Sequence, residues 1–283
     1  MRRFLRIVCH SQLWIAVSAA LFLFICARLL GRELPLAVYG AAFCWAWAVY
    51  LTDSGLGSSR EDLDTQPERA KFLRKYSWLL YVVAPLSAIA AGALLLTHLE
   101  TWRGWTLAAA LVLLGAGYAL PLIPWHGWKR LKEIGIGKTP LVTLGWAVGG
   151  IGFALIVGER TGNGTAAPIL AVIGYLVLLL FLDALSADFR DITGDQREGT
   201  KTAASALGRF AWFALIFGVL LAGFLWITPE RRDARWSVAG IMWFASLVSI
   251  LTIKFHKRDE TLFTIAISAW RFLGAAALAM VIV

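Results

Sequence analysis

The chain has 283 residues, of which 59% are hydrophobic and 16% are charged, and its formal net charge at pH 7 is +9. Soluble domains contain roughly 45 to 50% apolar and about 25% charged residues, so this composition excludes that class and indicates a lipid bilayer as the solvent. The basic residues are scattered over segments between apolar runs, which favours a membrane-topology signal over a nucleic-acid partner. The three cysteines have no paired spacing, and we interpret them as packing residues.

The N-terminal segment contains Arg2, Arg3 and Arg6 and resembles the basic region of a secretory signal. The apolar stretch that follows, from about Leu13 to Leu30, is too long for a signal core and predicts a retained first span. Later apolar runs are also long enough to cross about 30 Å of hydrocarbon. Because they are continuously apolar, helices are favoured over a barrel. The sequence predicts an all-α, polytopic membrane protein, one domain over residues 1–283, with about nine spans near 13–31, 35–52, 77–97, 104–123, 140–158, 166–187, 206–228, 236–254 and 261–283.

The charged residues predict the orientation of these spans. With the N-terminus in the cytoplasm, 19 Lys and Arg residues fall on the cytoplasmic side and seven on the other, which fits the positive-inside rule. Thirteen of the 18 acidic residues fall on or near the same side. We therefore expect cytoplasmic loops at 53–76 and 188–205, and a functional site at that face; longer loops alone would also enrich both charges there.

The strongest local motif directly follows the sixth apolar run. Asp188, Asp191 and Asp195 are spaced i, i+3 and i+7, so a continuing helix would place all three carboxylates on one face. Such close negative charges favour a hard cation, and Mg²⁺ also bridges to phosphate oxygens. Asp183 lies deeper, within the apolar run, where an ionisable residue is a functional candidate or a hydrogen-bonded core acid.

The run Asp191-Ile-Thr-Gly-Asp195, with Gly199 and Thr202 downstream, resembles the second aspartate-rich motif of the UbiA-type intramembrane prenyltransferases. The resemblance extends over nearly the whole chain, because that family has nine transmembrane helices with acidic motifs after the second and sixth. It implies that Mg²⁺ and a polyprenyl diphosphate bind here, with Asp191 and Asp195 as metal ligands and catalytic residues. The spacing of the three carboxylates makes Asp188 a further candidate metal ligand.

The first acidic segment departs from the family pattern NDxxDxxxD. Counting forward from Asp53, the next two acidic positions hold Leu56 and Arg60. If Pro67-Glu68-Arg69 is matched to the family's downstream P-x-R, Asp62 takes the third acidic position. Asp53 and Asp62 are the candidate metal ligands, with Glu61 and Asp64 as possible substitutes, and the Gly-Ser-rich stretch between them predicts a bent segment.

Basic residues lie between the fourth and fifth spans, after Tyr118 and Pro121. This resembles a basic loop in the family and implies that Lys132 and Lys138, together with Arg69, bind the diphosphate. A membrane-surface anchor is the alternative for any one of them.

Three function classes follow. The resemblance implies a Mg²⁺-dependent prenyltransferase that moves an isoprenoid from a polyprenyl diphosphate to a hydrophobic, lipid-associated acceptor of aromatic character. A terpene cyclase of the same type would ionise the same substrate and close the cation on its own chain. The third class is a non-catalytic membrane protein or transporter, but transporters concentrate their charge near the midplane, whereas this chain has it mainly at one face.

Overall fold

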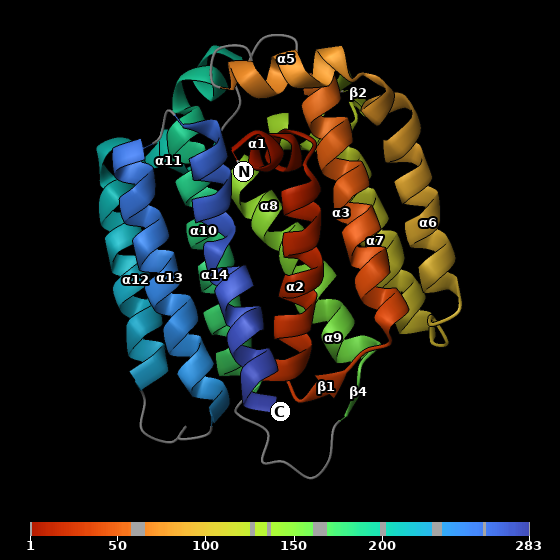
Figure 1. The fold of residues 1–283 in the computed structure, drawn as a ribbon, viewed down its shortest axis with the longest axis vertical. Coiled ribbons are helices and arrows are strands. Elements are labelled where there is room, and N and C mark those ends of the chain that lie inside the picture. The colour runs from red at the N-terminus through yellow and green to blue at the C-terminus, as the bar shows by residue number, and fades with distance from the viewer. Residues whose placement is uncertain are drawn as a thin grey trace.

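The structure is a computed structural model that describes residues 2–57, 66–124, 128–134, 137–160, 169–198, 202–227, 234–256 and 259–282. Each of the nine predicted apolar ranges overlaps a helical segment, which confirms the expected all-α membrane fold (Figure 1). The longer elements are α1 (Arg2–His10), α2 (Leu13–Leu29), α3 (Leu36–Gly57), α5 (Pro67–Lys75), α6 (Ala84–Leu96), α7 (Trp102–Ala119), α8 (Lys138–Ala147), α10 (Ile169–Glu198), α12 (Ala211–Ile227), α13 (Ala234–His256) and α14 (Glu260–Ile282).

Shorter elements complete these spans and join them. Wide π-helical turns, η1 (Leu79–Val83) and η3 (Val148–Gly152), continue into α6 and α9 (Phe153–Ile156), and η2 (Leu131–Glu133), α11 (Ala203–Leu207) and η4 (Gly208–Phe210) lie between spans. The strands have two residues each: β1 (Arg32–Glu33) pairs antiparallel with β4 (Glu159–Arg160), and β2 (Ile123–Pro124) with β3 (Trp128–Lys129).

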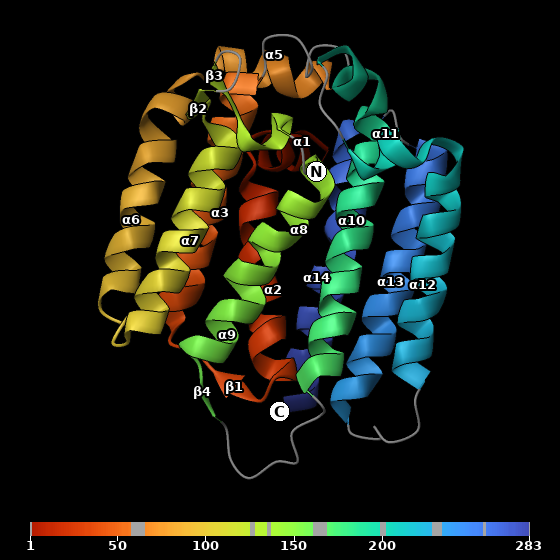
Figure 2. The same ribbon diagram turned by 180° about the vertical axis from the view of Figure 1, so that it is seen from behind.

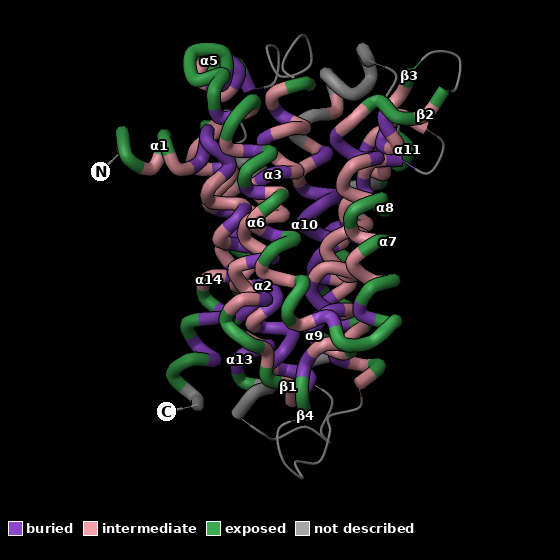
Figure 3. Tube along the Cα trace, turned by 90° about the vertical axis from the view of Figure 1, so that its right-hand side faces the viewer, coloured by how far each residue is buried: buried purple, intermediate pink, exposed green. Residues whose placement is uncertain are grey.

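The helices form an upright bundle with α2 and α8 near its centre (Figures 1 and 2). α3, α6 and α7 lie on one side, and α10, α12, α13 and α14 lie on the other. α5 crosses one end of the bundle, and α1 extends outward near that end, bent by 71° from α2 (Figure 3). The end marked by α5 also holds the C-terminal ends of α3 and α10, so Asp53 and the acidic end of α10 lie there.

Four described segments are long and apolar enough to span a membrane by themselves: Leu79–Leu96, Lys138–Ile156, Ile169–Phe189 and Glu260–Met280. The bent pair α1 and α2 counts as a fifth candidate. α3 and α7 are 22 and 18 residues long and run beside these segments, but they carry polar or aromatic residues such as Asp53 and Tyr118. These segments make the chain a multi-pass membrane protein.

Two helices extend beyond the ends predicted from hydropathy. α3 continues to Gly57 and α10 to Glu198, and α5 is helical within the predicted loop 53–76. The helical hydrogen-bond ladder does not depend on lipid, so a helix that leaves the hydrocarbon can continue into water. The first eleven residues of the predicted loop 188–205 are therefore helical, and Asp188, Asp191 and Asp195 all belong to one helix.

The core lies where α2, α10, α13 and α14 meet. Its largest fully buried side chains include Trp270, Tyr175 and Phe22. The Tyr175 hydroxyl donates to the Ala239 carbonyl at 2.5 Å, which satisfies its polar group and joins α10 to α13. Large apolar side chains such as Ile89 and Phe217 remain exposed on the outer faces, as expected of helices that contact lipid.

Candidate active site

A polar cavity of about 170 Å³ lies between the helices near the end that α5 crosses. Its lining includes five residues that the sequence predicts for metal or diphosphate binding: Asp53, Arg69, Lys132, Lys138 and Asp188. They come from α3, α5, η2, α8 and α10. The fold thus brings candidates from five elements to one cavity.

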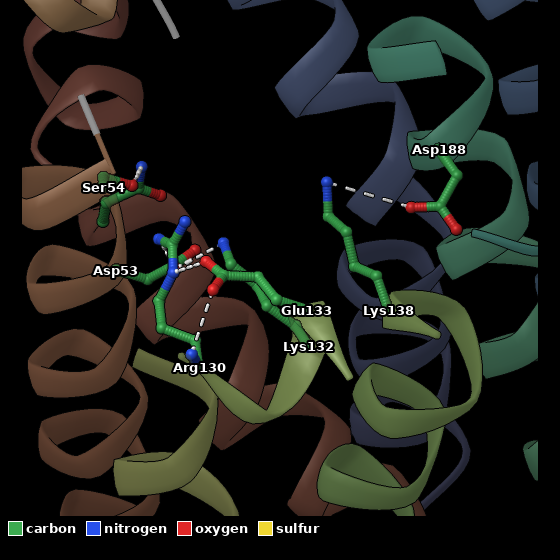
Figure 4. Close-up of polar contacts among 8 residues, drawn as sticks. Asp53, Ser54, Arg130, Lys132, Glu133, Lys138 and Asp188 are labelled. Atoms are coloured by element: carbon green, nitrogen blue, oxygen red, sulfur yellow. Dashed lines mark hydrogen bonds and ion pairs between the residues drawn. The ribbon is translucent and has the colours of Figure 1, made fainter. Parts of the chain in front are cut away.

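Asp53 lies on α3 and is held by basic residues of the segment that precedes α8. Lys132 Nζ lies 2.7 Å and Arg130 Nη1 lies 3.5 Å from Asp53 Oδ1 (Figure 4). Lys132 is 4% exposed, and its ammonium also lies 5.1 Å from the centre of the Tyr118 ring. At such low exposure these ion pairs are far less screened by water than surface pairs.

A compact turn holds Lys132 in place. The Arg130 backbone N–H donates to Glu133 Oε2 at 3.1 Å, and the Arg130 guanidinium also pairs with the Glu133 carboxylate. Arg130 is therefore shared between Glu133 and Asp53 (Figure 4). The turn presents one lysine and one arginine to the carboxylate of α3.

Asp188 lies across the cavity on α10 and is 2% exposed. The Thr139 hydroxyl donates to its Oδ2, and Lys138 Nζ lies 4.0 Å from its Oδ1. Thr139 also accepts the backbone N–H of Ala203, the first residue of α11, at 2.8 Å. Thr139 thus connects the second acidic segment to α8 and to the start of α11.

The start of α8 depends on a glycine. Gly137 precedes Lys138 and has φ of 85°, a backbone conformation that side-chain-bearing residues rarely adopt. This turn places Lys138 and Thr139 in the first turn of the helix, and Pro140 fits there because the first-turn amides need no helical partner.

Arg69 reaches the cavity from α5, and α14 fixes that helix. Glu260 accepts the backbone N–H groups of Glu68 and Arg69, both at 3.0 Å, through its two carboxylate oxygens. The first amides of a helix have no helical partner, so a carboxylate there satisfies them and interacts well with the helix dipole.

Three predicted ligands cannot be placed as side chains. Asp62 lies in 58–65, outside the described residues, as do Glu61 and Asp64. Asp191 and Asp195 belong to the helical backbone of α10, one and two turns beyond Asp188, but their side chains are not among those described. Among the described side chains, no cluster of three or more acidic, His or Cys residues forms a ready metal site.

An apolar pocket of about 110 Å³ adjoins the polar cavity. Tyr50, Tyr118, Val142 and Trp146 line both spaces, and the Trp146 Nε1–H donates to the Tyr50 hydroxyl at 2.8 Å. The remaining lining of the pocket is apolar or glycine and comes from α2, α3, α7, α8 and η3: Ala19, Phe22, Ala42, Trp45, Ala46, Val49, Leu111, Leu114, Gly115, Leu141, Gly145, Gly149 and Gly150. The two spaces are adjacent, so they fit a molecule whose charged head lies in the polar cavity and whose apolar tail lies in the apolar pocket.

Several residues of the site were not identified from the sequence. Thr139 and Glu260 contact residues of the cavity wall and Tyr50 lines it, yet each is a common residue type with partners distant in sequence. Arg271 is a charged residue within the last apolar range, and the structure pairs it with Asp183 at the cavity wall. The sequence indicates this pair only in that each of the two charged residues lies within an apolar run.

Comparisons with known proteins identify solved structures that have a similar fold. No protein-family model and no curated protein sequence matches the chain. Among solved structures, a UbiA homologue from Archaeoglobus fulgidus matches with a TM-score of 0.63 at 15% identity, over 98% of each chain. The same homologue bound to GPP and Mg²⁺ matches with a TM-score of 0.61 at 16% identity, over 96% of this chain and 99% of that one.

A digeranylgeranylglyceryl phosphate synthase matches with a TM-score of 0.57 at 17% identity, over 99% of this chain and 98% of that one. The helices of this chain therefore align with those of the matched structures over nearly the whole length of both chains, although few residues are identical. The resemblance inferred from the acidic motif is confirmed at the level of architecture: the chain has the fold of the UbiA homologues.

Proposed function

We propose that this protein is a Mg²⁺-dependent intramembrane prenyltransferase. The observation that carries the proposal is the polar cavity, lined by Asp53, Asp188, Lys132 and Lys138, which shares a wall with an apolar pocket. A polyprenyl diphosphate has the matching distribution of charge and hydrocarbon. Structures with the same fold contain GPP or DMAPP together with Mg²⁺, which supports this class of ligand.

The residues present fit a magnesium ion. Asp53 and Asp188 supply carboxylate oxygens to one cavity, and Asp191 and Asp195 extend the helix that carries Asp188. Hard oxygen ligands of this kind suit Mg²⁺, which keeps several waters and uses few protein carboxylates. We propose Asp53, Asp188, Asp191 and Asp195, with Asp62, as its ligands. When bound, Mg²⁺ would neutralise charge on the diphosphate leaving group.

The protein's own residues would complete the site. Lys132, Lys138 and Arg69 would donate hydrogen bonds to diphosphate oxygens and stabilise the charge that develops as the allylic C–O bond breaks. The buried aromatic wall of Tyr50, Tyr118 and Trp146 would exclude water from the resulting cation, whose positive charge an aromatic face also stabilises. The acceptor would then attack that carbon and lose a proton.

We also propose that the whole chain acts as one transmembrane domain, with the N-terminus and the segments 53–76 and 188–205 in the cytoplasm. The excess of Lys and Arg at that end supports this orientation. Labelling of single cysteines introduced at exposed positions of α5 and of β4, with a membrane-impermeant thiol reagent in intact cells, tests it. Protection at α5 and labelling at β4 is the expected pattern.

The decisive experiment incubates the purified protein in lipid nanodiscs with Mg²⁺ and a panel of prenyl diphosphates, and measures diphosphate release and organic products. Release that EDTA abolishes and Mg²⁺ restores is expected, and it should be lost in Asp191→Ala and Asp195→Ala. Glu159→Gln, an exposed carboxylate in β4, is the control. Full activity in both aspartate variants rejects their assignment. Cyclic products formed without an acceptor would identify a terpene cyclase instead.

A further inference from the structure

An ion pair buried within the bundle lies beside the proposed diphosphate site. Arg271 Nη2 lies 2.6 Å from Asp183 Oδ2, and the same oxygen accepts the Trp270 Nε1–H at 2.6 Å. Both charged residues line the polar cavity, and Arg271 is 4% exposed while Asp183 is 7% exposed. Ionisable residues at such positions are costly, so a buried pair of this kind is a functional candidate by default.

The arginine retains donors that the protein does not use. Asp183 pairs with Arg271 through Nη2, while Nε is buried without a hydrogen-bond partner among the described residues. A guanidinium carries five N–H donors in a planar fork, and leaving buried donors unpaired is unfavourable. Because Arg271 lines the cavity, a ligand there would accept hydrogen bonds from guanidinium donors that Asp183 does not use.

The surroundings hold this fork rigidly. The guanidinium carbon lies 4.3 Å from the centre of the Trp146 ring and 4.6 Å from that of Trp270. Trp146 is itself tied to Tyr50 by its indole N–H. A planar cation packed against two indoles loses little freedom when it binds a ligand.

Along the bundle axis, the ion pair of Arg271 and Asp183 lies at the level where the proposed reaction would occur. Asp183 precedes Asp188 by five residues on α10, which is about 7.5 Å along the helix axis. Asp188 lies at the proposed diphosphate end, and Trp146, beside Arg271, lines the apolar pocket proposed for the tail. Arg271 therefore lies at the level where the head of the donor meets its hydrocarbon and where an attacking acceptor must arrive.

We propose that Arg271, held by Asp183, binds an oxyanion of the second substrate, a carboxylate or a phosphate, and so positions the acceptor next to the reacting carbon. A planar fork matches such a group with two parallel hydrogen bonds. This inference rests on the proposed function, because it assigns the second ligand of the same cavity. Arg271 is on this account an acceptor-binding residue, and Asp183 is the positioning residue that acts through it.

Binding measurements on the purified protein in nanodiscs test the proposal. The probes are benzoate, phenyl phosphate and the neutral benzamide, and geranyl diphosphate with Mg²⁺ is measured in parallel. The main variant is Asp183→Asn/Arg271→Gln, which removes both charges and leaves no unpaired buried ion; its thermal unfolding reports whether it folds. Arg28→Gln, which removes an arginine paired with Glu33 at the other end of the bundle, is the control.

We expect at least one anionic probe to bind about tenfold or more tightly than benzamide, and to lose that advantage in the double variant. The affinity for geranyl diphosphate should stay within about twofold of that of the wild type, because Arg271 lies deeper in the bundle than the residues proposed to bind the diphosphate. Asp183→Asn alone should weaken the anionic probe less than the double variant. The better probe, carboxylate or phosphate, identifies the source of the oxyanion.

Any of the following results overturns the proposal: no preference for an anion in the wild type, the same preference in the double variant, or a parallel loss of geranyl diphosphate binding, which is what a scaffolding pair predicts. An anionic probe that competes with geranyl diphosphate and ignores Arg271 occupies the head site and also overturns it. Failure of the proposed function is distinct, since wild-type protein would then not bind geranyl diphosphate.

Discussion

Lys132 Nζ lies 2.7 Å from Asp53 Oδ1, so a carboxylate of the first acidic segment is held by a lysine from the connection between α7 and α8. The sequence assigns these two residues to different tasks, metal binding and diphosphate binding. Their contact places both candidate residues in one polar network, which Arg130 and Glu133 extend (Figure 4).

Substitution of Lys132 tests that network. Lys132→Ala should weaken the binding of geranyl diphosphate with Mg²⁺ about 10- to 100-fold, because a hydrogen bond to a charged group contributes about 1.5–3 kcal/mol. The measurement is a binding isotherm in nanodiscs. Lys129→Ala, three residues away in β3, is the matched control and should bind like wild type. Equal affinity in the two variants would remove Lys132 from the diphosphate site.

The hydroxyl of Thr139 should be needed for stability as well as for the site. Thr139 is fully buried, donates to Asp188 and accepts from the Ala203 N–H. Thr139→Val keeps the shape but removes the hydroxyl that donates to Asp188 and accepts the Ala203 N–H, and the loss of buried hydrogen bonds of this kind costs about 1–3 kcal/mol each. We expect a lower melting temperature in detergent. Thr139→Ser keeps the hydroxyl, so a similar loss in that variant would mean that the methyl group is what matters.

Much of the fold was predictable because lipid imposes a simple requirement. A span must be apolar along its length and satisfy its own backbone, so all nine apolar ranges overlap helical segments. The ends of α3 and α10 were missed because hydropathy detects where lipid ends, whereas the helix itself continues to Gly57 and Glu198.

The candidate site was predictable where charged residues stand next to apolar runs or belong to a segment that resembles a family motif. Asp188 and Asp53 stand next to apolar runs, and both line the polar cavity. Thr139 and Glu260 are ordinary residues whose roles arise from partners 49 and about 190 positions away, which no local pattern records. The pairing of Arg271 with Asp183 likewise depends on how α14 packs against α10.

Glu260 should control the order of α5. Its carboxylate accepts the backbone N–H groups of Glu68 and Arg69. Glu260→Gln loses the negative charge and one acceptor, so the first turn of α5 should open more often. Hydrogen exchange of a peptide covering 67–75 should be faster, by about fivefold for each lost kcal/mol. Glu100→Gln, an exposed residue before α7, is the control; unchanged exchange in α5 would show that the cap is dispensable.

Gly145 should influence which tail length the apolar pocket accepts. It lines the pocket, and a Cβ built there meets nothing within 4 Å, whereas a Cβ at Gly150 would lie 2.2 Å from the Phe22 ring. Gly145→Leu therefore adds volume to the pocket without a backbone clash. The apolar pocket would shorten, so we expect the variant to favour dimethylallyl over geranylgeranyl diphosphate.

The shift in relative kcat/KM should be about tenfold or more, since each lost methylene contact contributes about 1–3 kcal/mol. Gly92→Leu is the matched control: Gly92 lies in α6, also meets nothing within 4 Å and does not line the pocket. Both substitutions raise helix propensity by a similar amount, so the two variants differ chiefly in whether the new side chain fills the apolar pocket. If both variants show the same chain-length profile, the tail does not lie along α8, and the apolar pocket is not the binding site of the tail.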